Sequence, residues 1–233
     1  MTYHNSTLNQ TEFDVAVQTF AHHLNISTSK LNAFKEELTL RAYKRGQVIY
    51  YDTLDTTHLK FLVRGLITRE SYSDTGESYL WMNREPQLFP IEQLFNATQT
   101  HEMCTAFHDC LVLCIPKYLL ESLCMKDHHL FIRIYELLTL NMKQHIHHNM
   151  ILTCKTAKDK VIYLINHICE NIGIETDAFY EVPASITIQA LGDMAGLSRE
   201  TVSHIIHDLT TENLVYKDPE HWIISKQLLH SSL

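Results

Sequence analysis

The sequence predicts an α+β protein in which a β-roll precedes long helices and a winged helix-turn-helix. Three observations support this order. Short β-rich runs with tight turns occupy residues 41–116. Residues 117–172 contain no glycine and are dominated by Leu, Ile, Met, Lys, Gln and His. Two short amphipathic patterns separated by a glycine follow. The 233 residues, 45% of them hydrophobic, are sufficient for more than one folded core.

The amino-terminal part of the chain has a helical pattern. Leu31, Phe34 and Leu38 recur at intervals of three and four residues. They follow the polar stretch 27–29, whose hydroxyl side chains can cap a helix. We therefore expect a short amphipathic helix over 30–38.

Four short runs after residue 41 have the composition of strands. They are rich in β-branched and aromatic residues, and turn-forming residues separate them. The expected strands span 47–51, 59–63, 66–72 and 110–115. Many short strands with tight turns are typical of a sandwich or jelly roll, so residues 41–116 are expected to form a β-roll.

Three cysteines, Cys104, Cys110 and Cys114, fall in the last part of the expected roll. Cys110 and Cys114 are four residues apart in the run CLVLCI. Because side chains alternate between the two faces of a strand, these two thiols are expected on the same face. We expect this face to lie in the core, where a thiol packs as a small apolar group. A redox-sensing thiol and a metal ligand are the alternatives.

The absence of glycine and of strand signals from residues 117–172 predicts one or two long helices. Residues at alternating steps of three and four form a seam of the coiled-coil type, which predicts that two copies of the chain pair along it. The seam consists of Tyr135, Leu138, Met142, His145, Asn149 and Leu152. A neighbouring register through Phe131, Ile134 and Leu138 fits almost as well. Packing of this helix on its own domain is the alternative without a dimer.

A helix-turn-helix is predicted in residues 187–209. Thr187 is placed to cap a first short helix, Gly196 to end it, and Ser198 to cap a second helix. Apolar residues of the second helix form one buried stripe, namely Val202, Ile205, Ile206 and Leu209. Its opposite side is polar. Two helices joined by a short glycine-containing turn, the second with a polar outer face, are typical of a DNA-reading motif.

The polar face of the second helix predicts how the motif contacts DNA. Arg199 can donate two hydrogen bonds to O6 and N7 of guanine, and Glu200 can accept one from cytosine N4. His204 is the third candidate for base reading. Other polar side chains are expected to hold phosphates and set the register, namely Gln189, Ser198, Thr201, Ser203 and His207. The run LVYKDPEHWII has the pattern of two wing strands around a turn.

The net charge limits the kind of nucleic-acid binding that can be expected. The chain has 19 Lys and Arg against 27 Asp and Glu, a net charge of −8. From residue 155 onward six basic residues stand against eleven acidic ones, which leaves −5 in the candidate DNA-binding part. Non-specific affinity comes from phosphate neutralisation, so we expect weak binding to random DNA and a dependence on base contacts and dimerisation.

The run ITIQALGDMAGLSRETVSHIIHDL closely resembles the helix-turn-helix of the CRP/FNR family of bacterial transcription regulators, including its Ser-Arg-Glu-Thr-Val core at 198–202. The run YKRGQVIYYDTLDTTHLKFLVRGLI resembles the opening of that family's β-roll. The helical pattern of the amino-terminal part and, from about residue 40 onward, the resemblance together divide the chain into four expected segments. They are helices in 1–40, a sensor roll of the cyclic-nucleotide-binding type in 41–116, a linker and dimerisation helix in 117–154, and a winged helix-turn-helix DNA-binding domain in 155–233.

The resemblance also implies a function. It implies a homodimer that binds double-stranded DNA at an inverted repeat of a TGTGA-like half-site and recruits or positions RNA polymerase. Arg199 and Glu200 stand where the family has its base-reading Arg and Glu, whereas His204 replaces a second Arg. With the run AKDKVIYLI, the sequence is most similar to the subgroup that activates arginine deiminase genes when oxygen is scarce.

Cyclic AMP is the effector that the resemblance implies, but most of the residues that hold its phosphate are absent. In FPIEQLF only Glu92 matches the family's Gly-Glu-Leu cassette, and THEMCTAF lacks the Arg that binds the phosphate in the family. Thr100, His101 and His145 are the other pocket candidates. No cofactor is therefore expected to be required. Oxygen-sensing members of the family bind an iron–sulfur cluster through cysteines near the amino terminus. No cysteine precedes Cys104 here, so the resemblance implies no such cluster.

Other classes of function have weaker support. The sequence contains no P-loop, GxGxxG, GxSxG, HExxH or CxxC motif, so we expect no enzyme. The histidines in 145–148 lack partners at a metal-ligand spacing and are expected on a solvated or interface face. No apolar run is long enough for a membrane span, so we expect a cytosolic protein without a membrane partner. The remaining alternative is a signalling β-roll whose last helices dock a protein instead of DNA.

Overall fold

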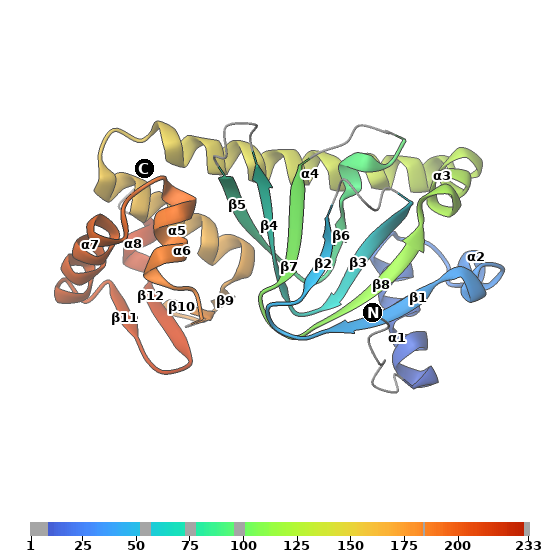
Figure 1. Ribbon diagram of the computed structural model, residues 1–233, viewed down its shortest axis with the longest axis horizontal. Coiled ribbons are helices and arrows are strands. Elements are labelled where there is room, and N and C mark those ends of the chain that lie inside the picture. The colour runs from blue at the N-terminus through green and yellow to red at the C-terminus, as the bar shows by residue number, and fades with distance from the viewer. Residues whose placement is uncertain (1–8, 52–56, 73–77, 96–100, 184, 231–233) are drawn as a thin grey trace. The chain divides into compact units, whose positions relative to one another are not determined.

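The computed structural model describes residues 9–51, 57–72, 78–95, 101–183 and 185–230 (Figure 1). The chain divides into two compact units, each described by itself below. The first contains residues 1–77 and Asn83–Asn141, and the second contains Ser78–Met82 and Met142–Leu233. No helix in the described ranges is long and apolar enough to cross a lipid bilayer.

Helix α1, Gln10–His23, begins at a capping box. The Asn9 side chain accepts a hydrogen bond from the Glu12 backbone at 2.8 Å, and the Glu12 carboxylate accepts one from the Asn9 backbone at 3.2 Å. The buried side of the helix includes Phe20, whose ring centroid lies 5.1 Å from that of Phe61. Helix α1 is thereby packed onto the roll of the first unit.

The helix expected over 30–38 is only partly present. Helix α2 covers Ser29–Asn32, and a 3-10 turn covers Lys35–Glu37. Phe34 lies between them at φ −121° and ψ 7°, outside the helical region, so the backbone cannot continue as one helix. The burial of Leu31 that the apolar spacing predicts is confirmed, but the predicted helix is longer than the one in the structure.

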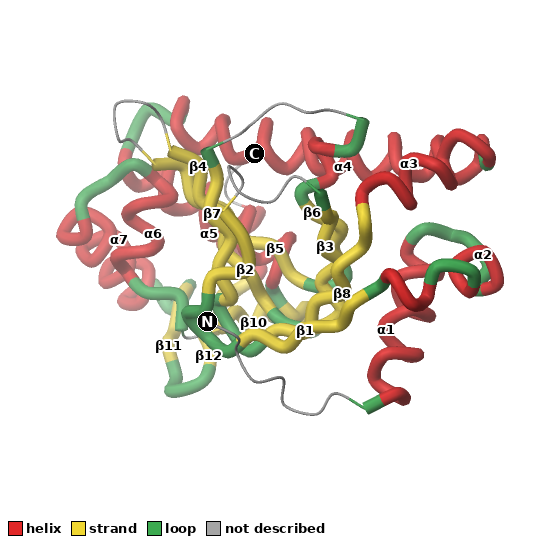
Figure 2. The backbone as a smooth tube through the Cα atoms, turned by 45° about the vertical axis from the view of Figure 1, so that its right-hand side comes forward, coloured by secondary structure: helices red, strands yellow, loops and turns green. Residues whose placement is uncertain are grey.

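Two four-stranded antiparallel sheets form the roll. Their strand orders are β1-β8-β3-β6 and β2-β7-β4-β5, and Figure 2 shows β1, β8 and β3 side by side. The strands are β1 (Thr39–Tyr43), β2 (Val48–Tyr51), β3 (His58–Arg64), β4 (Leu66–Tyr72), β5 (Ser78–Arg84), β6 (Gln87–Phe89), β7 (Glu102–Ala106) and β8 (Cys110–Pro116). The strands predicted from the sequence are all present.

Strand β8 shows why the run CLVLCI contains no polar residue. Every residue of the strand is buried, because a core lies on each side of its sheet. Leu111, Leu113 and Ile115 pack in the core that includes the helices, whereas Cys110 and Cys114 pack in the core inside the roll. The burial expected for these two thiols is confirmed.

Residues 117–172 form three helices instead of the one or two expected. They are α3 (Lys117–Lys126), α4 (His128–Thr153) and α5 (Ala157–Ile172). Asp127 is extended and its carboxylate accepts hydrogen bonds from the first turn of α4, which separates α3 from α4. The Thr156 hydroxyl caps α5 by accepting from Asp159 N at 3.1 Å.

The second unit ends in a small winged domain. Its sheet has the strand order β11-β12-β10-β9. The elements are β9 (Ile174–Glu175), β10 (Phe179–Pro183), α6 (Ile188–Ala195), α7 (Arg199–Thr211), β11 (Val215–Lys217), β12 (His221–Ser225) and α8 (Lys226–His230). The predicted fold class, a β-roll, a long helix and a winged helix-turn-helix in this order, is confirmed.

Candidate nucleic-acid interface and interior charge cluster

The turn between α6 and α7 is defined by one cap at the start of each helix. Thr187 Oγ1 accepts a hydrogen bond from Ala190 N at 3.0 Å, and Ser198 Oγ accepts one from Thr201 N at 3.2 Å. Between the helices Gly196 has φ 63°, in the left-handed region that favours glycine. The caps and the breaker predicted from the sequence are confirmed.

A second glycine, Gly192, allows the turn to pack closely on α6. A Cβ atom at this position would lie 2.8 Å from the carbonyl oxygen of Leu197. The Leu197 backbone N–H donates to the Gly192 carbonyl at 2.9 Å, which closes the turn. The turn before α7 is therefore closed by a backbone hydrogen bond, in addition to the Ser198 cap of the helix itself.

Helix α7 has one buried side and one polar, exposed side. Its buried residues are Val202, Ile205, Ile206 and Leu209, as the periodicity predicts. The side chains that face solvent include Arg199, Glu200, Ser203, His204 and His207. An exposed helix with an Arg and a Glu in its first turn offers both a bidentate donor and an acceptor to base edges in a major groove.

Several of the expected phosphate-positioning side chains already have partners. Gln189 Nε2 donates to Asp193 Oδ1 at 2.7 Å, and the Ser198 and Thr201 hydroxyls lie 2.9 Å apart. Ser203 is exposed on α7. Gln189, Ser198 and Thr201 therefore have structural partners besides any phosphate they contact.

The wing is fixed to the core by a tryptophan. Trp222 of β12 is buried, and its Nε1 donates to the Ile186 carbonyl at 2.9 Å. Lys217 of β11 places its Nζ 4.4 Å from the centre of the Trp222 ring, a cation–π contact. The ammonium group is thus held on the wing, where a cation suits a phosphate.

Part of the predicted seam on α4 is exposed. Tyr135, Met142 and Leu152 are 65%, 57% and 45% exposed, and Asn149 is also exposed. Ile134, by contrast, is buried in the core of the first unit. In the neighbouring register, therefore, Ile134 serves packing within the chain, whereas Phe131 is 44% exposed, and Tyr135 and Met142 of the predicted seam are exposed to a larger extent.

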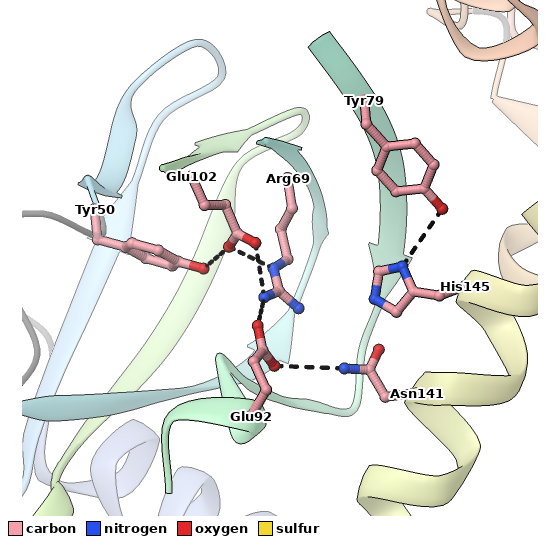
Figure 3. Close-up of polar contacts among 7 residues, drawn as sticks. All are labelled: Tyr50, Arg69, Tyr79, Glu92, Glu102, Asn141 and His145. Carbon is pink, nitrogen blue, oxygen red and sulfur yellow. Dashed lines mark hydrogen bonds and ion pairs between the residues drawn. The ribbon is translucent and has the colours of Figure 1, made fainter. Parts of the chain in front are cut away.

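Two other seam residues are used within the chain. Leu138 is partly buried against the core of the first unit. In the second unit the ring centroids of His145 and Trp81 lie 4.9 Å apart. His145 Nδ1 lies 3.4 Å from the Tyr79 hydroxyl (Figure 3). Ile146, which follows His145, presents an exposed apolar side chain on α4.

A buried charge cluster lies inside the roll of the first unit (Figure 3). At its centre is Arg69 of β4, whose side chain is fully buried. Arg69 Nε donates to Glu102 Oε1 at 2.7 Å, and Nη2 donates to Glu102 Oε2 at 2.9 Å, which is a bidentate pair. Arg69 Nη2 also pairs with Glu92, and the Tyr50 hydroxyl donates to Glu102.

The charges of this cluster stabilise one another. Burial by itself lowers the pKa of Arg69, but the carboxylates of Glu92 and Glu102 reverse this effect and hold that pKa well above its ordinary value. Burial, with a contribution from Glu102, raises the pKa of Tyr50 well above its ordinary value. Arg69 therefore stays charged and Tyr50 stays a hydrogen-bond donor.

Glu92 connects the cluster to the long helix. It lies in the 3-10 turn Ile91–Gln93, and its side chain is 34% exposed, compared with 4% for Glu102. Asn141 Nδ2 of α4 donates to Glu92 Oε2 at 3.5 Å. The cluster thus joins three strands of one sheet, β2, β4 and β7, to α4 within the first unit.

The four residues expected to form an effector pocket have different surroundings. Glu92 belongs to the charge cluster, and His101 is exposed next to β7. Thr100 lies outside the described residues. His145 packs on Trp81 in the second unit.

Sequence reasoning missed Arg69, Glu102 and Tyr50. The segment 100–107, where the resemblance places a phosphate-binding Arg, contains none, and the buried Arg of the roll comes from β4. The alternation in LITRESY contained a signal, because it places Arg69 on the same face as the buried Ile67.

Comparison with known proteins identifies relatives along nearly the whole chain. No family model matches the chain. The chain is 42% identical over 214 residues to the HTH-type transcriptional regulator ArcR of Staphylococcus aureus (strain Newman), covering 92% of each sequence. ArcR of the strain USA300 is similar to the same extent.

Solved structures share the fold. FixK2 from Bradyrhizobium japonicum superposes with a TM-score of 0.70 at 17% identity, covering 83% of this chain and 96% of that one. A CooA mutant from Carboxydothermus hydrogenoformans superposes with a TM-score of 0.70 at 12% identity, covering 93% of this chain and 95% of that one. A CRP/FNR-family transcriptional regulator from Thermus thermophilus superposes with a TM-score of 0.65 at 18% identity, covering 83% of this chain and 98% of that one.

Proposed function

The chain belongs to the ArcR group of HTH-type transcriptional regulators within the CRP/FNR family, and from this premise we propose that two copies of it bind a near-palindromic operator and activate transcription. The observation that carries the proposal is the exposed face of α7. Arg199 and Glu200 stand side by side at the start of a helix whose opposite face is buried. This arrangement suits entry of the first turn of the helix into a major groove.

The proposed half-site resembles TGTGA. In this assignment Arg199 reads a guanine, Glu200 accepts from a cytosine, and His204 contacts the outer base in place of an Arg. Gln189, Ser198, Thr201, Ser203 and His207 hold the backbone, and Lys217 adds a contact from the wing. Because the domain is acidic overall, sequence-specific contacts have to supply most of the affinity.

The proposed dimer forms along α4. Met142, Ile146, Met150 and Leu152 are large apolar side chains, each about half exposed in the second unit. Leaving such a row in water is unfavourable by ~25 cal/mol per Å² of apolar surface, so a second copy of the helix is its natural partner. A two-fold dimer then matches a two-fold repeat in the DNA.

The proposed targets are arginine deiminase genes, which would be activated when oxygen is scarce through contact with RNA polymerase. The support is the similarity to ArcR and to the CRP/FNR fold. We propose that DNA binding requires no metal or iron–sulfur cluster. Cyclic AMP is the effector to be tested, given the roll fold.

The test is fluorescence anisotropy with a labelled TGTGA inverted repeat and a scrambled duplex, at one stated salt concentration, with and without cyclic AMP. We expect the repeat to bind more tightly than the scrambled duplex by about 1,000-fold or more. Equal affinity for both duplexes in both conditions would contradict the proposal. In that case the acidic carboxyl-terminal domain is better explained as a protein-docking module.

A further inference from the structure

Two histidines stand on the polar side of α7 without a partner in the protein. His204 and His207 are both exposed, and because they are three residues apart they share one side of the helix. Neither imidazole has a hydrogen bond, an ion pair or a ring contact with another residue in the described part of the chain. His145 and His167 differ from them, because their rings pack on neighbouring side chains. The nitrogens of His204 and His207 are therefore open to a ligand of the helix.

The elements that pack on α7 approach it from its buried side. Ile206 lies around one small apolar cavity with Ile165 of α5, Leu191 of α6 and Val215 of β11. The charged side chains and the histidine of these three elements are Lys158, Asp159, Lys160, His167, Glu170, Asp193 and Lys217. None of these described groups forms a hydrogen bond or an ion pair with His204 or His207.

Charges on α7 itself leave the polar side short of cations. Glu200 precedes His204 by four residues and Asp208 follows it by four, so both carboxylates lie one helical turn from this histidine. His207 has hydroxyl side chains at the same two spacings. Arg199 is the only Lys or Arg in the helix. Any further positive charge on this side of α7 has to come from the two histidines.

The charge of an imidazole decides which partners it suits. A neutral imidazole has one N–H donor and one acceptor nitrogen, whereas the protonated form has two donors and a positive charge. Phosphate oxygens and the O6 and N7 atoms of guanine are all acceptors, so the acceptor nitrogen of a neutral imidazole finds no partner among them. Histidine is the side chain that changes between the two forms near neutral pH.

We propose that His204 and His207 contact DNA as protonated imidazolium groups, so that binding takes up protons and becomes tighter in mild acid. The proposal rests on the proposed function, in which the polar side of α7 enters the major groove. Two protonated imidazoles add to only six Lys and Arg in each acidic carboxyl-terminal part, and a dimer doubles the effect.

The two histidines have different contacts in this proposal. His204 lies one helical turn from Glu200, close to the end of α7 that reads bases, and it donates to a base edge. His207 lies further along the helix and donates to a phosphate, which sets affinity but not sequence.

The test is fluorescence anisotropy of the full chain with the labelled repeat and the scrambled duplex at pH 7.5 and pH 6.0, each at several salt concentrations, with and without cyclic AMP. The variants are H204Q, H207Q, their combination and H207K. H22Q is the matched control, because His22 is an exposed histidine of α1 in the first unit. Circular dichroism at both pH values establishes that each variant is folded.

We expect the wild type and H22Q to bind the repeat about tenfold or more tightly at pH 6.0 than at pH 7.5, because protons are taken up at each half-site. The affinity of the combined variant should change less than about twofold over this range. H204Q should weaken binding to the repeat mainly, and H207Q should weaken binding to both duplexes equally. H207K carries a permanent charge and should bind more tightly than the wild type at pH 7.5. The slope of log affinity against log salt should steepen at pH 6.0 by about 0.9 for each imidazolium that contacts a phosphate.

A wild type that prefers the repeat but binds it equally at both pH values overturns this proposal and leaves the proposed function standing. A wild type that shows no preference for the repeat at either pH contradicts the proposed function, and this proposal with it. A combined variant that keeps the pH dependence also overturns the proposal, since other groups then take up the protons. If the combined variant does not fold, the single variants decide, and full pH dependence in both of them contradicts the role given to these histidines.

Discussion

Replacement of Arg199 by alanine is expected to abolish most of the sequence specificity without affecting the fold. The side chain is exposed at the first turn of α7, and the cap of that helix is supplied by Ser198. Alanine is a favourable helix residue, so the free energy of unfolding should change by less than about 0.5 kcal/mol.

The expected loss in DNA affinity follows from the number of base contacts. One bidentate Arg–guanine pair contributes about 1 to 3 kcal/mol of discrimination, and a dimer reads two half-sites with two copies of Arg199. The total is about 2 to 6 kcal/mol, which corresponds to a roughly 30-fold to 20,000-fold larger dissociation constant. The acidic domain provides little non-specific affinity to mask this loss.

The assay is a double-mutant cycle by fluorescence anisotropy at fixed salt. The wild type and R199A are each measured on the repeat and on a repeat in which one G·C pair per half-site is changed to A·T. The pair that Arg199 reads is the one whose change weakens the wild type but not R199A. R45A, which removes an exposed Arg from the first unit, controls for the loss of charge.

An R199A affinity within twofold of the wild type on the repeat would refute the assignment of Arg199 as a base reader. A loss that is equal on every duplex, including a scrambled one, would also refute it. That result would make Arg199 a phosphate contact, which sets affinity but not sequence.

Three further predictions concern the dimer, the histidines and the thiols. M142E should convert the proposed dimer to a monomer in light scattering, whereas M125E, at the 80% exposed Met125 of α3, should leave it intact. Burial lowers the pKa of His23 and His167 to about 4. Because the unfolded chain then binds more protons below about pH 6.5, the free energy of unfolding should fall by about 1 to 2 kcal/mol per histidine between pH 7 and about pH 5; urea unfolding at both values checks this. Burial also raises the pKa of four of the cysteine thiols. Native thiol titration should therefore detect only the half-exposed Cys154, and fast reaction of further thiols would support a redox sensor.

The helix-turn-helix could be predicted closely because its signals are local. Thr187 and Ser198 act within three residues of the backbone donors that they cap. Gly196 adopts the left-handed conformation that its position after a helix indicates. The buried stripe of α7 follows from helical spacing alone. None of these features requires knowledge of distant parts of the chain.

The interior of the roll could not be predicted in the same way. Arg69 and Glu102 are separated by 33 residues and meet only because β4 and β7 pair in one register. A charged residue in a strand is normally expected to face water, so the burial of Arg69 depends on two carboxylates that arrive from other elements. The seam on α4 shows a similar limit. The spacing of the seam residues is visible in the sequence, but the packing of the His145 ring on Trp81 is not.

The most direct test of two-fold DNA reading is the dependence of affinity on the spacing between half-sites. Two reader helices in one dimer match half-sites about one helical turn apart, so an insertion of about 5 base pairs places the second half-site on the opposite side of the duplex. Anisotropy with this spaced repeat should give the affinity of a single half-site. An unchanged affinity would contradict the proposal that two copies of α7 read one operator together.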